Sequence, residues 1–259
     1  MLTIDGIGLP EEQRDCIKRH SRFFSEAVPR LKGVLIKVFG RSIVPGEEVK
    51  ALVFVLDRLA VEDFMEILLL AGNGYGNGAL RLLRGMFERV VHARYFSRHP
   101  EDVRAFLDYD YVHQKKGLEH GIPLPHDQAE EVRKQYERVK AQFVDPNSSR
   151  VRGSWTQKDV LSMAREVGLA DSYVTHFYWP TLQAHTTVMA IKSRLKESEG
   201  RLRFDQGPQR DEASVALCGA HMLVAFMLGD HNKYFALGLD GDLPSVLNDF
   251  KASWEEQPP

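Results

Sequence analysis

The sequence predicts an all-α fold, a single multi-helix bundle of about eight or nine helices. Apolar residues recur at the spacing of a helix through most of the 259 residues. No convincing run of alternating β-branched residues bounded by turns is found, which argues against a sheet. Glycine and proline cluster where the helical pattern breaks, and these positions mark helix ends. A chain of this length can bury one large core, so residues 1–259 are interpreted as one domain.

Each periodic segment ends at residues that disfavour a helix. The first stops at Gly40, the second at the glycine run 72–78, the third at Pro100 and a later one at Gly168. The predicted helices cover residues 11–39, 45–71, 78–98, 101–120, 127–143, 157–167, 180–197, 211–237 and 244–254.

The middle of the chain is expected to protrude from the bundle. Residues 144–155 and 198–210 are the most loop-like stretches, yet neither resembles a long flexible linker. We therefore predict that residues 101–155 form a protruding helical subregion of the same domain.

Charge and cysteine content exclude several classes of protein. The formal net charge is −2 and the isoelectric point is about 6.6, so no global field attracts nucleic acid or an anionic membrane. The 2 cysteines are too few for a disulfide framework or a thiolate zinc site, which predicts a cytoplasmic location.

The most apolar segment is interpreted as a buried helix and not as a membrane span. Residues 213–229 are shorter than the roughly 20 residues that a span needs, and His221 interrupts them. The same apolar pattern fits packing within one chain or across a homodimer.

Charged residues line one edge of the predicted helix 78–98. Arg84, Glu88 and His92 follow one another at i,i+4 steps beside an apolar arc, with Arg81 and Tyr95 close by. Solvated charges are expected opposite the core, so this row predicts either a structural ion-pair ladder or a functional site.

A second candidate group lies in the segment from Tyr178 to Met189. At 100° per residue His185 falls on the face of Tyr178, opposite Gln183, and is expected to face the core. If this helix touches helix 78–98, the imidazole would lie near Glu88, whose charge would favour the protonated form. The two alternatives are a hydrogen-bonded core histidine and a proton-transfer group.

The glycine run 72–78 is interpreted mainly as a helix cap followed by a turn. It does not indicate a dinucleotide site, because no strand precedes it. A weaker alternative is an anion site at the start of the next helix, with Arg81 and Arg84 one turn in.

No metal or cofactor is predicted. Glu88 and His92 have the spacing of a ligand pair, but the repeated Glu and Glu-x-x-His motifs of carboxylate-bridged metal bundles are absent. Arg94 and His99 match the short Arg-x4-His signature of HEPN ribonucleases. They also fit a cationic helix C-terminus, which is the preferred interpretation.

The stretch A-L-R-L-L-R-G-M-F-E-R-V-V-H-A-R-Y-F, then Trp155, then Y-W-P-T-L-Q-A-H resembles an uncharacterised bacterial family of helical domains. The resemblance covers roughly residues 60–195. The last segment departs from the family's Tyr-x-x-Leu-Ser-x-x-x-His-like pattern by lacking the serine. The resemblance implies a helical bundle that groups Arg84, Glu88 and His185, and it implies no established activity.

These observations predict a polar pocket inside the bundle. Arg84, Glu88 and His185 are the predicted catalytic residues, and a HEPN-like ribonuclease of a toxin or defence system is the concrete version. The expected partners are RNA or a small anionic ligand and a second copy of the chain, with no membrane. The alternative is a non-catalytic scaffold or ligand sensor in which the same residues form a structural network. The predicted ligand-binding residues are Arg81, His92, Tyr95 and Tyr178.

Overall fold

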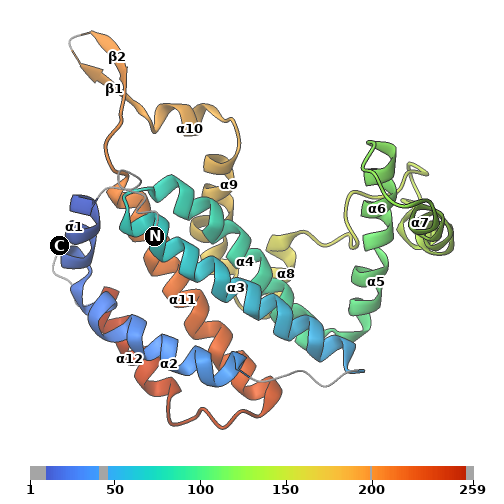
Figure 1. The fold of residues 1–259 in the computed structure, drawn as a ribbon, viewed down its shortest axis with the longest axis horizontal. Helices are drawn as coiled ribbons and strands as arrows, with labels where there is room; N and C mark the ends of the chain where they lie inside the picture. The colour runs from blue at the N-terminus through green and yellow to red at the C-terminus, as the bar shows by residue number, and fades with distance from the viewer. Residues whose placement is uncertain (1–9, 41–45, 199, 255–259) are drawn as a thin grey trace.

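Three long helices form the centre of the fold (Figure 1). The computed structural model describes residues 10–40, 46–198 and 200–254. Helices α3 (Glu48–Gly72) and α4 (Gly76–Arg98) form a hairpin, and α11 (Arg210–Phe235) packs against both. The prediction of an all-α bundle is confirmed.

Helix α4 is buried along the face that its sequence predicts. The six apolar side chains of the predicted arc all have no exposed surface, because the 3.6-residue period aligns them toward α3 and α11. The helix begins at Gly76, two residues before the predicted start. The six residues are Leu80, Leu83, Met86, Phe87, Val90 and Val91.

Helix α11 contains the apolar segment 213–229. It spans 26 residues, and by length and composition it could cross a membrane, which is weak evidence on its own. In the fold, 61% of its most apolar stretch is buried within the chain, against α3 and α4. The segment therefore forms part of this chain's own core.

The first and last segments of the described part pack together on α11. Here lie α1 (Pro10–Arg19), a π-helical turn η1 (Phe23–Ala27), α2 (Val28–Phe39) and α12 (Leu243–Trp254). The rings of Phe23, His221 and Trp254 pack together at this junction, with Phe23 5.1 Å from Trp254. The single predicted helix 11–39 is thus divided at the π-helical turn. Residue 45, the predicted start of the second helix, lies outside the described part together with residues 41–44.

The glycine run forms a tight turn, as predicted. Gly74 has a φ of 79°, a conformation that L side chains rarely adopt. The turn packs on the start of α11, where Gln209 N–H donates to the Gly74 carbonyl at 2.9 Å. The Gln209 side chain accepts from Asn77 N–H at 3.0 Å. This end of α4 is therefore covered by the chain itself, which argues against the alternative of an anion site.

The predicted protrusion is a helical arm at one end of the bundle (Figure 1). It contains η2 (Pro100–Asp102), α5 (Val103–Asp108), α6 (Asp110–Glu119), α7 (His126–Val139) and η3 (Lys140–Phe143). The predicted helix 101–120 breaks at Tyr109, and 127–143 ends as a 3-10 turn. The chain returns to the bundle through α8 (Val160–Val167), η4 (Ala170–Ser172), η5 (Val174–Tyr178) and α9 (Trp179–Ala184).

The predicted helix 180–197 is wrong beyond Ala184. His185 has extended backbone angles of φ −101° and ψ 163°, and a short helix α10 (Val188–Lys192) follows. The Thr187 side chain accepts from Ala190 N–H and so starts α10 separately. Strands β1 (Leu195–Ser198) and β2 (Arg201–Phe204) then pair antiparallel around Gly200, which corrects the expectation of no strand.

Candidate functional site: a cleft between the bundle and the arm

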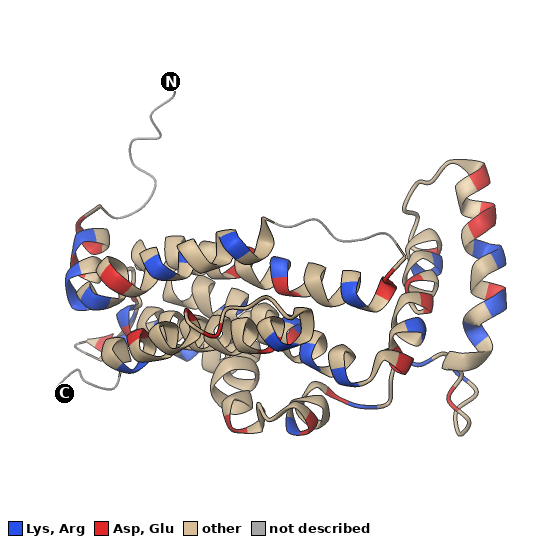
Figure 2. Cartoon of the chain, turned by 90° about the horizontal axis from the view of Figure 1, so that it is seen from below, with Lys and Arg blue, Asp and Glu red and all other residues tan. Residues whose placement is uncertain are grey.

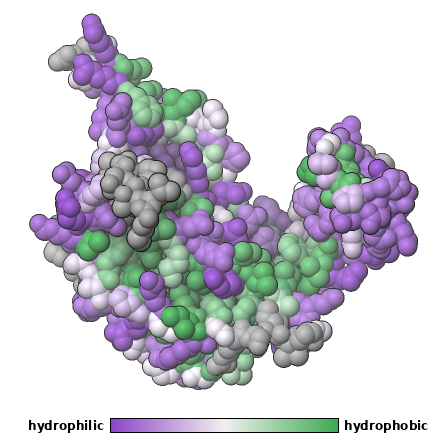
Figure 3. All heavy atoms as spheres, in the orientation of Figure 1, coloured by the Kyte–Doolittle hydropathy of each residue, from purple (hydrophilic) through white to green (hydrophobic). Residues whose placement is uncertain are grey.

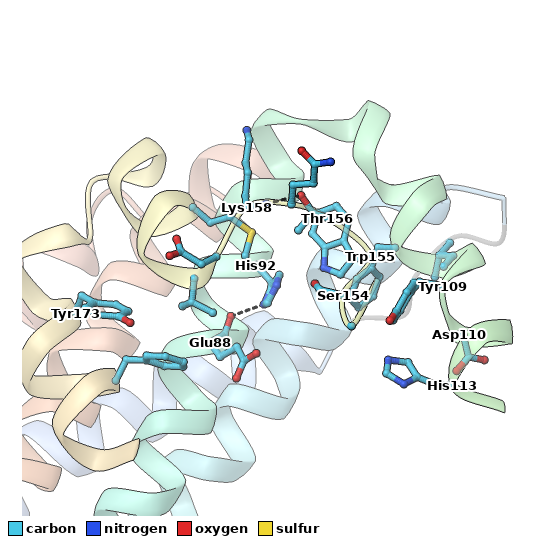
Figure 4. A pocket seen from close by; sticks show the side chains of 18 residues that line it. Glu88, His92, Tyr109, Asp110, His113, Ser154, Trp155, Thr156, Lys158 and Tyr173 are labelled. Carbon is cyan, nitrogen blue, oxygen red and sulfur yellow. Dashed lines mark hydrogen bonds between the residues drawn. The ribbon is translucent and has the colours of Figure 1, made fainter. Parts of the chain in front are cut away.

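A cleft of about 840 Å³ opens where the arm leaves the bundle. Figure 4 shows Glu88 and His92 on the bundle side and Tyr109, Asp110 and His113 on the arm side. Residues 153–159, which lead from the arm to α8, also line the cleft. The volume is within the usual range for small-molecule sites.

His92 presents an unprotonated nitrogen in this cleft. Its Nδ1 lies 2.8 Å from the carbonyl oxygen of Glu88, one turn earlier on α4. A carbonyl can only accept, so Nδ1 donates the proton and Nε2 keeps its lone pair. Burial lowers the pKa of His92, and the nearby Glu88 only partly opposes this. The imidazole is therefore neutral at neutral pH, and its Nε2 makes no hydrogen bond to the described residues.

Glu88 is a half-buried carboxylate, and the guanidinium of Arg84 beside it makes its closer contacts with other residues. Arg84 Nη1 lies 3.7 Å from the Glu88 carboxylate, beyond hydrogen-bond distance. The Arg84 Nε donates to Thr181 Oγ1 at 2.9 Å, and the guanidinium lies 4.8 Å from the centre of the Phe177 ring. The Glu88 carboxylate is thus only partly neutralised by the protein.

Aromatic side chains from separate segments meet in the cleft. Trp155 packs edge-on against Phe106 of α5 at 5.7 Å and lies 6.3 Å from the His92 ring. Tyr173 and Phe177 lie 5.2 Å apart on the bundle side. These rings give the cleft flat apolar surfaces beside its polar groups.

The charged groups of the cleft are mainly acidic. Glu88, Asp110 and Asp159 line it, against the single ammonium of Lys158. Hydrogen bonds from Ser162 lower the pKa of Asp159, which therefore stays ionised.

Lys158 adds little positive charge to the cleft. Its ammonium lies 2.8 Å from Glu166 and donates to the hydroxyl of Tyr95 at 2.9 Å. The hydrogen bond to Glu166 raises the pKa of Lys158, with a further contribution from Tyr95. Because Glu166 already neutralises this ammonium, the field inside the cleft favours a cation.

The predicted grouping of Arg84, Glu88 and His185 is met only in part. The two chain segments do touch, but through Arg84 and Thr181. The expectation that His185 faces the core is wrong, because the helix ends at Ala184 and the imidazole is exposed. Among the described residues no hydrogen bond or ion pair joins His185 to Arg84 or Glu88. Gln183, which was expected to point away from the core, is buried.

The predicted ligand-binding residues are scattered. His92 lines the cleft, while Arg81 and Tyr178 are exposed and lie outside its lining. Tyr95 is fully buried behind it, where its hydroxyl donates to Asp102 at 2.5 Å. Sequence reasoning did not select Trp155 as a site residue, although the family resemblance included it.

The arm contributes three polar residues that no helical pattern near Glu88 could have selected. They come from the end of α5 and from α6, which approach the cleft only through the fold. His113 is exposed and also lines the cleft. The three residues are Tyr109, Asp110 and His113.

The Arg94 and His99 pair does not form a shared site in this chain. Arg94 lies 2.5 Å from Asp230 of α11 and is 13% exposed. His99 stacks on Tyr95 at 4.4 Å between ring centres, and its Nε2 lies 3.2 Å from Glu166. Each residue has its own carboxylate partner, and neither lines the cleft.

A buried acid–imidazole pair lies elsewhere, between α3 and α11. The Nδ1 of His231 is 2.6 Å from Asp57 Oδ2, and both side chains are almost fully buried. Burial raises the pKa of Asp57 to about 6, although the hydrogen bond from His231 lowers it. The adjoining cavity holds only about 10 Å³, so this pair has no room for a ligand beyond a water molecule. Within residues 10–40, 46–198 and 200–254, no group of three or more His, Cys, Asp or Glu is arranged to hold a metal ion.

Comparison with known proteins identifies a family for the part of the chain that contains the cleft. A model described as "Family of unknown function (DUF5677)" matches residues 51–202, more than half of the chain. Neither the curated proteins nor the solved structures give a significant match.

Proposed function

The chain belongs to this family of unknown function, and from the chemistry of the cleft we propose that it binds a small, flat, positively charged organic molecule. The observation that carries the proposal is that one cleft of about 840 Å³ combines aromatic ring faces, a partly neutralised Glu88 carboxylate and a neutral His92 whose Nε2 is unprotonated. The protein is then a ligand sensor, which was one form of the alternative expected from the sequence.

Each class of lining group has a role in this binding. The aromatic faces of Trp155 and Tyr173 suit a flat ring and attract a cation through their electron-rich faces. The Glu88 carboxylate is the counter-ion, and His92 Nε2 accepts a hydrogen bond from an N–H group of the ligand. An anionic ligand would instead meet three carboxylates with a single, already paired ammonium.

Aromatic amines are expected to bind, and aromatic acids of the same shape are not. Isothermal titration calorimetry compares tyramine with 4-hydroxyphenylacetate, and tryptamine with indole-3-acetate. The two members of each pair share a ring, and their side chains carry opposite charges. We expect each amine to bind at least about tenfold more tightly than its acid. Glu88→Gln should remove most of this preference, whereas Glu62→Gln, on the exposed side of α3, should keep it. If the amines give no heat of binding, or bind no better than the acids, the proposal fails.

Binding of the amines should weaken as the pH falls through the lowered pKa of His92. Protonation there removes the Nε2 acceptor and adds a positive charge beside the cationic ligand. The loss should therefore appear below the pH at which an exposed histidine titrates. His92→Ala should bind more weakly at neutral pH and lose this part of the pH dependence. An unchanged pH profile in that variant would argue against the role of His92.

Ribonuclease activity is a second candidate, favoured by one observation. The free Nε2 of His92 beside a carboxylate has the protonation state of a general base that could remove a proton from a ribose hydroxyl. The acidic lining, however, repels phosphate.

Incubating the protein with a labelled single-stranded RNA tests this candidate. Cleavage that His92→Ala abolishes and the exposed His185→Ala keeps would place the reaction in the cleft. If His185→Ala instead loses RNA cleavage while its melting temperature stays the same, the result would support the catalytic role predicted for His185. No cleavage by the unsubstituted protein would remove the nuclease hypothesis and leave the binding proposal intact.

A further inference from the structure

The arm stands apart from the bundle and is joined to it at its base. Figure 3 shows an open hollow between the arm and the rest of the molecule on this face. Figure 2 shows α7, the outer helix of the arm, from the side, with acidic and basic residues along its length, as expected of a solvated helix. Of the arm's helices, the short turn η2 makes the most contact with the bundle, at α4. The angle of the arm, and with it the width of the cleft, is therefore set at this base.

Two connections of the chain cross the base. The chain enters the arm from α4 through η2 and returns through residues 153–159. Tyr95, in the last turn of α4, is fully buried here. Its hydroxyl donates to Asp102 of η2 at 2.5 Å and accepts from the Lys158 ammonium of the returning segment at 2.9 Å. One phenol oxygen thus joins α4 to both the outgoing and the returning connection.

The other polar contacts at the base act mainly on the bundle side. Glu166 of α8 lies 2.8 Å from the Lys158 ammonium and 3.2 Å from the His99 imidazole. His99 caps the end of α4, so these contacts fix α8 and the returning segment to the bundle. His99 also lies 3.3 Å from Glu101 of η2, but that carboxylate is 67% exposed, and such a pair contributes little. Within the described residues, the phenol hydroxyl is therefore the main side-chain link from the bundle to the outgoing connection.

Apolar packing at the base does not fix an angle. Phe96 of α4 lies 5.0 Å from Phe106 of α5 and 5.3 Å from Trp155, measured between ring centres. Apolar burial has no preferred direction, so these rings stay in favourable contact over a range of arm orientations. Hydrogen bonds, in contrast, weaken steeply when they are bent. The rings thus form a pivot, and the two bonds of the Tyr95 hydroxyl select one orientation about it.

We propose that the Tyr95 hydroxyl fixes the angle of the arm to the bundle, and so the width of the cleft. Tyr95 does not line the cleft, so it is a positioning residue that acts through Asp102 and Lys158. Trp155 and Lys158 both belong to the returning segment and line the cleft. Loss of the hydroxyl therefore moves the wall on which a ligand ring stacks. The effect on the arm is independent of any ligand, whereas the effect on binding rests on the proposed function.

Double electron–electron resonance between two spin labels measures the arm angle without a ligand. Arg133→Cys on α7 and Glu66→Cys on α3 place the labels at exposed positions on the arm and on the bundle. Cys218→Ser removes the partly buried native thiol, and Cys16 is fully buried, which protects it from the label. The unsubstituted Tyr95 chain should give one narrow distribution of distances.

Tyr95→Phe keeps the ring and removes the hydroxyl, so it should broaden this distribution. Asp102→Ala removes the acceptor at a partly exposed site and should do the same. Tyr111→Phe is the matched control, because the Tyr111 hydroxyl makes no hydrogen bond within the described part of the arm. In Tyr95→Phe the Lys158 ammonium, on a side chain that is 39% exposed, can bind water instead, so melting should fall by only a few degrees. An unchanged distribution in Tyr95→Phe or in Asp102→Ala would overturn the proposal, as would equal broadening in the control.

Calorimetry with tyramine then connects the arm angle to the cleft. If the binding-competent angle is populated a tenth of the time in Tyr95→Phe, tyramine should bind about tenfold more weakly. The variant should still prefer tyramine to 4-hydroxyphenylacetate, because Glu88 is intact. A broadened distribution with unchanged tyramine affinity would overturn the effect of the arm angle on the cleft. No binding of tyramine by the parent would instead remove the proposed function, and the distance distributions would still decide the role of Tyr95.

Discussion

Gly76→Ala is expected to lower the free energy of unfolding by about 3 kcal/mol, the upper part of the usual cost of overpacking. A Cβ at this position would lie 2.3 Å from the backbone oxygen of Gln209 and 2.6 Å from the backbone nitrogen of Ala213. Both atoms belong to the start of α11 and cannot rotate away as a side chain can. Relief requires α11 to move from the turn, which would disturb the packing of the three central helices.

Gly78→Ala is the matched control, two residues along the same helix. A Cβ there would lie 3.3 Å from the flexible Leu70 side chain and in ordinary contact with the Tyr75 Cβ at 3.9 Å. Alanine is favoured over glycine inside a helix by up to about 1 kcal/mol, so this variant should be as stable as the parent or more so. Urea unfolding followed by circular dichroism measures both. Equal stability of the two variants would contradict the close approach between the turn and α11.

His231→Leu is expected to destabilise the fold by about 3 to 5 kcal/mol near pH 8, because it leaves the Asp57 carboxylate buried without its partner. The effect should depend on pH. Burial already raises the pKa of Asp57 to about 6, and the hydrogen bond from His231 opposes that rise. Removing His231 therefore moves the pKa of Asp57 still higher.

The direction of the pH dependence follows from proton binding. Because the folded pKa of Asp57 lies above the unfolded value, the folded state holds its proton more firmly, and stability falls as the pH rises from about 4 to 6. In His231→Leu the fall continues above pH 6, so the difference from the parent should widen from pH 5 to pH 8. At pH 5 the carboxyl is protonated in both, and the remaining difference reflects packing and the lost hydrogen bond.

Asp57→Asn provides the control for the charge. In that background the ionisable carboxyl is absent, so His231→Leu should cost nearly the same at pH 5 and pH 8. Chemical unfolding of the four proteins at both pH values completes the cycle. A pH-dependent cost that persists with asparagine at position 57 would show that another group is responsible.

Much of the architecture follows from local pattern. The 3.6-residue repeat of the apolar residues predicts the buried face of α4, because a regular helix turns every such residue the same way. The glycine run predicts a turn at Gly74, where a positive φ is required. The loop-like stretch 144–155, which does not resemble a long flexible linker, predicts that residues 101–155 protrude from the same domain. These features depend on residues close together in the chain.

The region after Ala184 shows where local pattern fails. Helical periodicity placed His185 among inward residues, but the count holds only if the helix continues through it. The Thr187 cap starts a new helix, and the exposed L-K-E-S and R-L-R-F segments pair as strands. Competing local structures of similar free energy are decided by such caps and pairings, which apolar spacing does not reveal.

Local patterns in the sequence are enough to predict the helical class, the core face of α4, the turn before it and the protruding arm. They also place Glu88 and His92 on one edge of a helix. Packing between distant segments brings Trp155, Tyr109 and His113 beside them in a cleft and leaves His185 outside it. The physical reason is range: helix periodicity acts between residues a few positions apart, whereas a cleft forms where distant segments pack, and that packing is selected by the whole chain.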